Sequence, residues 1–77
     1  MEHFGDRLIR LRTQRGLSRY GVAKGTGLSH QLVAHLETMD RGGKVRGDTL
    51  RKLATFFGLT IEELLGPLDE EDDAQAA

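Results

Sequence analysis

The 77-residue sequence contains no cysteine and no tryptophan, one proline and four aromatic residues. The absence of cysteine excludes disulfide scaffolds and thiol chemistry, and a reducing cytoplasm is the compartment we expect. The longest apolar run is three residues, so no segment is long enough to span a bilayer. The first residues also lack the apolar core of a signal peptide.

Basic side chains are absent from residues 62–77, which carry seven acidic ones. Residues 1–61 hold all eleven Lys and Arg and five acids, so this body has a net charge of +6 and the remainder −7. A basic body indicates a polyanionic partner, although surface charge that only maintains solubility would give the same composition. We expect a single domain over residues 1–68 and a disordered acidic tail over residues 69–77.

Glycines and capping residues divide the body into five short helices, and no alternation typical of strands is found. The expected helices cover residues 4–15, 19–25, 30 to 37 or 39, 49–57 and 61–65. Their expected N-caps are Ser18, Ser29, Asp48 and, in a capping box with Glu63, Thr60. Gly16, Gly58 and the pair Gly66-Pro67 are expected to end helices.

Apolar residues recur at helical spacing in these segments, which predicts an all-α fold around one small core. The expected core residues are Phe4, Leu8, Leu11, Val22, Val33, Leu36, Leu50, Leu53, Ala54 and Phe57. So short a chain buries few apolar side chains, and its C-terminal segment is rich in leucine. We therefore expect a homodimer. The candidate interface residues are Phe56, Ile61, Leu65 and Leu68.

Residues 16–37 read GLSRYGVAKGTGLSHQLVAHLE and hold the spacing A-x3-G-x5-V-x2-L. Ala23 is small enough for two helices to cross, and Gly27 suits the left-handed backbone of a tight turn. Val33 and Leu36 can bury the second helix against the domain. This pattern resembles the helix-turn-helix of lambda-repressor-like regulators, the Cro-type or XRE family. The resemblance extends over about residues 5–66.

The resemblance implies that the second helix of the motif enters the DNA major groove and that dimers read two half-sites. Carried over by position, the base-contacting residues are Ser29, His30, Gln31, Ala34 and His35. The phosphate-contacting residues are Ser18, Arg19, Arg41, Lys44 and Arg46. In the family, an arginine of the first helix pairs with a glutamate that ends the recognition helix, and here these are Arg12 and Glu37.

Several positions depart from the family pattern. Arg19 stands where glutamine is usual, and Gly21 where a capping glutamate is common. Leu32 replaces a small polar residue, and we expect it to cover the edge of the core. The loop between Glu37 and Leu50 is about two residues longer than usual and lacks the family's proline, which leaves its backbone contacts undefined.

The resulting hypothesis is a sequence-specific DNA-binding transcriptional regulator, a repressor, that acts as a dimer in the cytoplasm. We expect no enzymatic activity, because the serines are better explained as helix caps. We expect no metal or cofactor, because His30 and His35 are five residues apart and cannot share a helical face. Two alternatives remain open at this point: an antitoxin whose tail binds a toxin, and a protein-interaction module without DNA binding.

Overall fold

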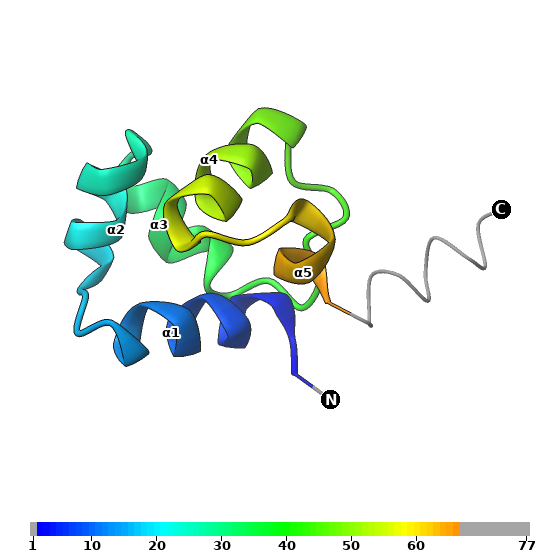
Figure 1. Cartoon of the computed structure of the whole chain (residues 1–77), viewed down its shortest axis with the longest axis horizontal. Helices are drawn as coiled ribbons and strands as arrows, with labels where there is room; N and C mark the ends of the chain where they lie inside the picture. The colour runs from blue at the N-terminus through cyan, green and yellow to red at the C-terminus, as the bar shows by residue number, and fades with distance from the viewer. Residues whose placement is uncertain (1, 67–77) are drawn as a thin grey trace, which may run out of the picture.

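The computed structural model describes residues 2–66, which form five α-helices and no strand (Figure 1). The helices are α1 (Phe4–Gln14), α2 (Arg19–Thr26), α3 (His30–Leu36), α4 (Gly47–Phe57) and α5 (Ile61–Leu65). The all-α class is confirmed, and the helix ends differ from the expected ones by no more than three residues. None of these helices is long and apolar enough to cross a membrane. Leu68 and the expected tail of residues 69–77 lie outside the described residues.

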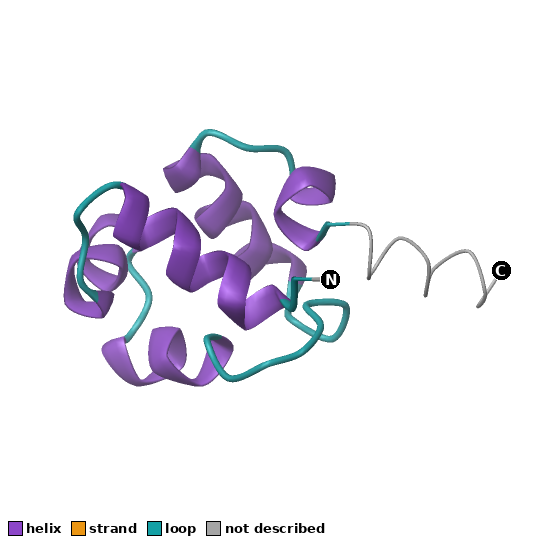
Figure 2. Ribbon diagram, turned by 90° about the horizontal axis from the view of Figure 1, so that it is seen from below, coloured by secondary structure: helices purple, strands orange, loops and turns teal. Residues whose placement is uncertain are grey.

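The helices enclose one core. Helix α2 packs against α3 and α4, while α5 packs against α4 and α1. Figure 2 shows α1 running across the molecule, with α3 at its edge. The buried apolar residues are Phe4, Leu8, Leu11, Val22, Ala23, Val33, Leu36, Leu50, Leu53, Ala54, Phe57 and Leu64. Every core residue expected from helical spacing is therefore confirmed.

Side-chain caps start three of the helices, as the sequence predicts. The hydroxyl of Ser18 accepts the N–H of Gly21 at 3.1 Å, and that of Ser29 accepts the N–H of Leu32 at 3.0 Å. Thr60 and Glu63 form the expected capping box, with N···O distances of 3.0 and 2.9 Å. Each cap satisfies backbone donors that have no partner inside the helix.

The start of α4 differs from expectation. The helix begins at Gly47, and its N-cap is Arg46, which makes no side-chain cap. Asp48 lies inside the first turn, where its carboxylate faces the guanidinium of Arg46 at 3.4 Å. The expected cap at Asp48 is therefore wrong. The negative charge instead stabilises the first turn through the helix dipole.

Helix α1 also begins without a side-chain cap, because the segment after α3 supplies the acceptors. The N–H groups of Phe4 and Gly5 donate to the carbonyl oxygens of Asp40 and Met39 at 2.9 and 2.8 Å. A Cβ at Gly5 would collide with the carbonyl oxygen of Glu37. This close approach of two backbones requires glycine at position 5.

Replacing Gly5 with alanine is therefore expected to destabilise the fold, since the obstructing atoms are backbone and cannot rotate away. Overpacking of this kind costs about 1–3 kcal/mol. For a domain of this size each kcal/mol lowers Tm by about 4–8 °C. Thermal unfolding followed by circular dichroism measures the loss.

The matched control is Gly47→Ala, at the first position of α4, where a Cβ would meet nothing within 4 Å. We expect its Tm to equal or exceed that of the wild type, because alanine favours the helix more than glycine does. Equal Tm values for the two variants would contradict the close approach at Gly5.

Candidate nucleic-acid interface

Helices α2 and α3 are joined by Gly27, whose φ of 80° provides the left-handed turn that the sequence predicts. Val33 and Leu36 are buried on the inner side of α3. Leu32 is half-buried and packs against the core, as expected from its apolar character. The inner face of α3 is thus fixed against the domain, and its opposite face is left to the solvent.

The residues expected to contact bases lie on this opposite face. Ser29, His30, Gln31 and His35 are exposed, and Ala34 is half-buried. Serine, glutamine and histidine side chains can both donate and accept hydrogen bonds, which is what base edges in a groove require. The small side chain of Ala34 leaves space at the centre of the face.

The residues expected to contact phosphate, four of them cationic, belong to the segments before and after α3 in the chain. Ser18 and Arg19 start α2, whereas Arg41, Lys44 and Arg46 belong to the loop before α4, and all five are exposed. A groove of about 230 Å³ separates α3 from this loop. It is lined by Leu32, His35, Leu36, Met39, Lys44, Val45, Arg46 and Thr49. Two loop cations, Lys44 and Arg46, therefore border the same groove as His35, one of the residues expected to contact bases.

Arg12 and Glu37, expected to pair, are in contact. Arg12 donates from Nε to Oε2 of Glu37 at 2.6 Å and from Nη2 to Oε1 at 3.3 Å. Arg19 also donates from Nε to Oε1 of the same carboxylate, at 2.8 Å. The Glu37 side chain is 3% exposed, so this carboxylate is removed from water and held by two guanidinium groups.

These contacts set the protonation of Glu37. Burial alone raises the pKa of a carboxyl, because it disfavours the charged form. The hydrogen bonds from Arg12 and Arg19 outweigh burial, so the pKa of Glu37 lies below its usual value. The carboxylate therefore stays ionised while the domain is folded at neutral pH.

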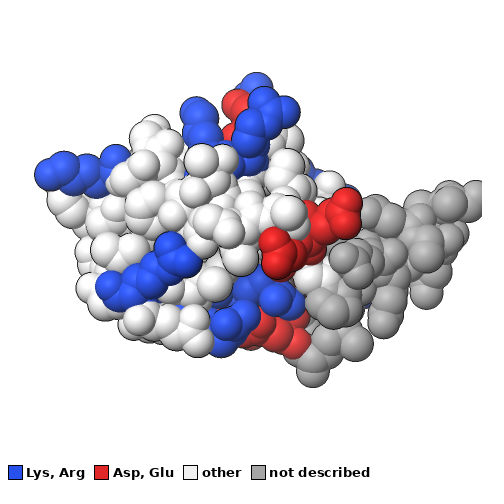
Figure 3. Space-filling view, in the orientation of Figure 1, with Lys and Arg blue, Asp and Glu red and all other residues white. Residues whose placement is uncertain are grey.

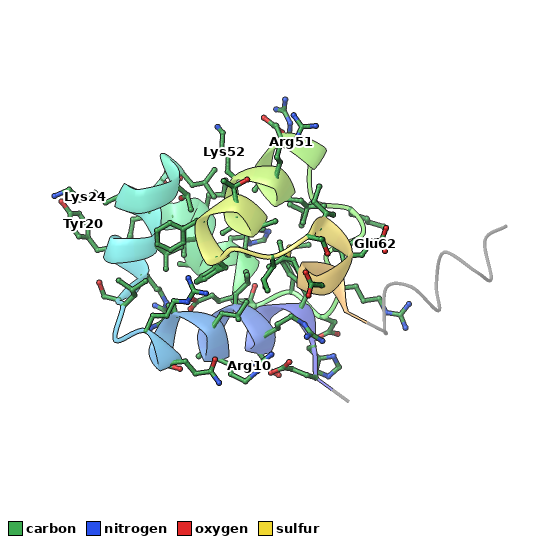
Figure 4. All side chains as sticks on the ribbon, viewed as in Figure 1. Arg10, Tyr20, Lys24, Arg51, Lys52 and Glu62 are labelled. Atoms are coloured by element: carbon green, nitrogen blue, oxygen red, sulfur yellow. The ribbon has the colours of Figure 1, made fainter. Side chains whose placement is uncertain are left out.

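The candidate dimer residues make contacts within the chain. Phe56, Ile61 and Leu65 are half-buried and pack against the core, and Leu68 lies outside the described residues. Phe56 also covers Gly25 of α2 and meets the ring of Phe57 edge-on. The apolar surface left for a second copy is therefore smaller than the leucine-rich sequence suggests. Tyr20 of α2, at 65%, is the one exposed large hydrophobic residue in the described part (Figure 4).

Two arginine contacts were not predicted from the sequence. One is the bond from Arg19 to Glu37, which joins residues 18 positions apart. The other is Arg15, whose Nη2 donates to the carbonyl oxygen of Phe57 at 2.6 Å while the guanidinium lies 5.1 Å from the Phe57 ring centroid. Arg15, the residue that follows α1, therefore caps the end of α4. Its position after α1 gives no local signal of that partner.

No group of three or more potential metal ligands comes together within residues 2–66. The chemistry available in this region is hydrogen bonding and positive charge along a helix that faces outwards. Such a surface can contact the edges of bases and the phosphates on either side of them.

Comparisons with known proteins agree with this geometry. A sequence model described as a helix-turn-helix domain matches residues 3–65. The HTH-type transcriptional regulator PuuR of Escherichia coli (strain K12) is 31% identical over 71 residues, as is that of Shigella flexneri. These matches cover 92% of this chain but 37% of each relative, so the chain spans little more than a third of their length.

A solved structure is also similar. The restriction-modification controller protein C.AhdI from Aeromonas hydrophila superposes with a TM-score of 0.69 and is 38% identical in sequence. The match covers 79% of this chain and 89% of that one. The resemblance to helix-turn-helix regulators found in the sequence is thus confirmed by sequence and by structure.

The lowered pKa of Glu37 predicts a specific acid sensitivity. A carboxyl whose pKa is lower in the folded state contributes stability above its unfolded pKa of about 4.3, and this contribution is lost as the pH falls through the folded value. We expect Glu37→Gln to cost about 1–3 kcal/mol at pH 7, because Arg12 loses its buried counter-charge. The difference in Tm from the wild type should shrink as the pH is lowered towards 3.

Glu2→Gln is the matched control for Glu37→Gln. Glu2 accepts Nε and Nη2 of Arg10 at 2.7 and 3.1 Å, but its side chain is 29% exposed and that of Arg10 is 43% exposed. Solvent screens such a pair, so the control should lose little stability at pH 7. Equal losses in the two variants, measured by thermal unfolding across this pH range, would contradict the role assigned to burial.

Proposed function

Because the chain belongs to the helix-turn-helix domain family of DNA-binding transcriptional regulators, we propose that α3 reads double-stranded DNA in a sequence-specific manner. The observation that carries this proposal is the division of α3 into a buried face and an exposed face. Val33 and Leu36 fix the helix, while Gln31 and His35 point away from the core side. The protein acts by binding in the cytoplasm, without catalysis, and represses transcription where it occupies a promoter.

Affinity and discrimination come from different residues in this proposal. Lys44 and Arg46 contact phosphates and release counterions, which favours every duplex equally. Gln31 carries an amide that can pair with N6 and N7 of adenine, the geometry for which glutamine is best suited. His30 and His35 can each donate a hydrogen bond to a guanine acceptor or to a phosphate.

We further propose that the protein binds DNA as a homodimer through α4 and α5. Figure 3 shows an uncharged area in the middle of the face formed by these helices, with basic side chains along much of its border and acidic side chains on its right-hand side. Phe56, Leu59 and Ile61 are half-buried and belong to these helices or to the turn between them. A two-fold dimer would cover their remaining apolar surface and present two recognition helices. No feature of residues 2–66 favours toxin binding over DNA binding, so the antitoxin alternative is not retained.

The proposed base contact is tested with Gln31→Ala. On the preferred operator we expect a loss of about 1–3 kcal/mol in binding free energy, confined to one base-pair position. The operator is first selected from random duplexes, and binding curves are then measured on it and on scrambled DNA. Equal loss on both duplexes, or no loss on either, would show that Gln31 does not read bases.

Lys44→Ala is the control for a contact without sequence information. We expect it to weaken binding to both duplexes alike and to lower the slope of log K against log salt by about 0.9. A loss restricted to the selected operator would instead place Lys44 among the residues that read sequence.

The dimer is tested by counting chains on DNA. Two chains per symmetric site are expected at saturation, by sedimentation of the complex. Ile61→Glu should reduce this to one chain and weaken binding, because a charge in the shared surface is costly to bury. Ile9→Glu makes the same change at a half-buried residue of α1 and should leave two chains on the site. One chain of the wild type per site would contradict the dimer.

A further inference from the structure

The carboxylate of Glu37 joins three elements of the fold. Glu37 directly follows α3, Arg12 belongs to α1, and Arg19 is the first residue of α2. Arg12 donates to both carboxylate oxygens, at 2.6 and 3.3 Å, and Arg19 donates to Oε1 alone, at 2.8 Å. With two cations and one anion, the cluster keeps a net charge of +1. The two arginines differ in how far this charge is exposed to solvent.

The guanidinium of Arg12 is fully used in hydrogen bonds within the protein. Its Nε and Nη2 donate to Glu37, and its Nη1 donates to the carbonyl oxygen of Leu17 at 3.2 Å. All three nitrogens are therefore engaged, and the side chain is 16% exposed. Arg12 holds the carboxylate in place and has little surface with which to reach a ligand.

Arg19 is arranged differently. Only its Nε is engaged, with Oε1 of Glu37 at 2.8 Å, and the side chain is 48% exposed. Its two Nη groups form no hydrogen bond with any residue of the described part. They make up the outer edge of a planar guanidinium, the edge that binds two oxygens of one phosphate. Glu37 grips the inner side of the same group and so limits its rotation.

We propose that Glu37 is a positioning residue that orients Arg19 to clamp one phosphate of the DNA backbone, while Arg12 only holds Glu37. The inference rests on the proposed DNA binding and adds the means by which the backbone contact is aligned with the recognition helix. Because Glu37 ends that helix, the phosphate held by Arg19 fixes the depth and angle at which α3 meets the bases. A guanidinium already held in place loses less conformational entropy when it binds.

The effect of Glu37→Gln on DNA affinity distinguishes positioning from simple electrostatics, because the two predict changes in opposite directions. Glu37→Gln removes a negative charge, so charge alone predicts tighter DNA binding. Positioning predicts weaker binding, by about tenfold, the loss expected for one charge-assisted contact. Glu2→Gln also removes one negative charge, beside Arg10, which projects from the outer side of α1 (Figure 4). This variant should bind DNA as tightly as the wild type or slightly more tightly.

Two substitutions of Arg19 test the clamp while leaving Glu37 and its bonds from Arg12 in place. Arg19→Lys keeps the charge but cannot grip Glu37 and a phosphate in one plane, so we expect about tenfold weaker binding with the salt slope retained. Arg19→Gln should weaken binding and also lower the salt slope by about 0.9. In the Arg19→Gln background, adding Glu37→Gln should cost no further DNA affinity.

The control for Arg19→Lys is Arg10→Lys, which makes the same change in the Glu2 pair and should bind DNA like the wild type. Wild-type affinity for Arg19→Lys would overturn the inference, as would tighter binding by a folded Glu37→Gln. If Glu37→Gln is unfolded at the assay temperature, the two Arg19 variants decide alone. A wild-type protein that binds no duplex would overturn the proposed function itself, and this measurement comes first.

Discussion

Glu37 is the one charged residue that is buried in the described part of the molecule, and the helix-turn-helix depends on how its charge is compensated. Removing a carboxylate from water costs several kcal/mol unless hydrogen bonds and opposite charges replace the lost hydration. Arg12 and Arg19 supply both from two other helices. Net stabilisation from such a buried ion pair is small in general. Its consequence here is geometric, because the carboxylate can be satisfied only when α1, α2 and the end of α3 are correctly placed.

The backbone of the following residues completes this attachment. The carbonyl oxygens of Met39 and Asp40 accept the first N–H groups of α1, and the carbonyl of Glu37 lies against Gly5. Helix α3 has seven residues, too few to be stable alone in water. Its orientation therefore comes from the packing of Val33 and Leu36 on one side and from this segment at its end. A helix held at both points can present its exposed residues in one fixed direction.

The parts of this structure that sequence predicted well are governed by local rules. The caps by Ser18, Ser29 and Thr60 join residues three positions apart, and the buried faces follow from helical spacing. Asp48 was misassigned because cap and first-turn positions are both favourable for aspartate, and only the backbone angles distinguish them.

What sequence did not predict depends on contacts between distant residues. Nothing near Arg19 or Arg15 indicates that their partners are Glu37 and the end of α4. The apolar surplus at the C-terminus was overestimated because the burial of Leu65 depends on the long loop, where a Cβ at Gly42 would meet the Leu65 side chain. The pair of Arg12 and Glu37 was predicted only through resemblance to a family. The base-contacting roles of α3 stay predictions, since exposure shows access and not contact.

The ion pairs are unevenly distributed, so the electrostatic potential differs between the sides of the domain. Arg7, which is 15% exposed, and Arg10, on the outer side of α1, both face Glu2, so their charge is partly cancelled. Lys24 of α2 and Arg51 and Lys52 of α4 have no ion-pair partner within residues 2–66, and Figure 4 shows all three projecting into solvent. Charges that lack a nearby counter-charge dominate the potential at distances of about 10 Å, the screening length near physiological salt. These unpaired charges of α2 and α4 therefore attract a polyanion more strongly than the paired arginines of α1 do.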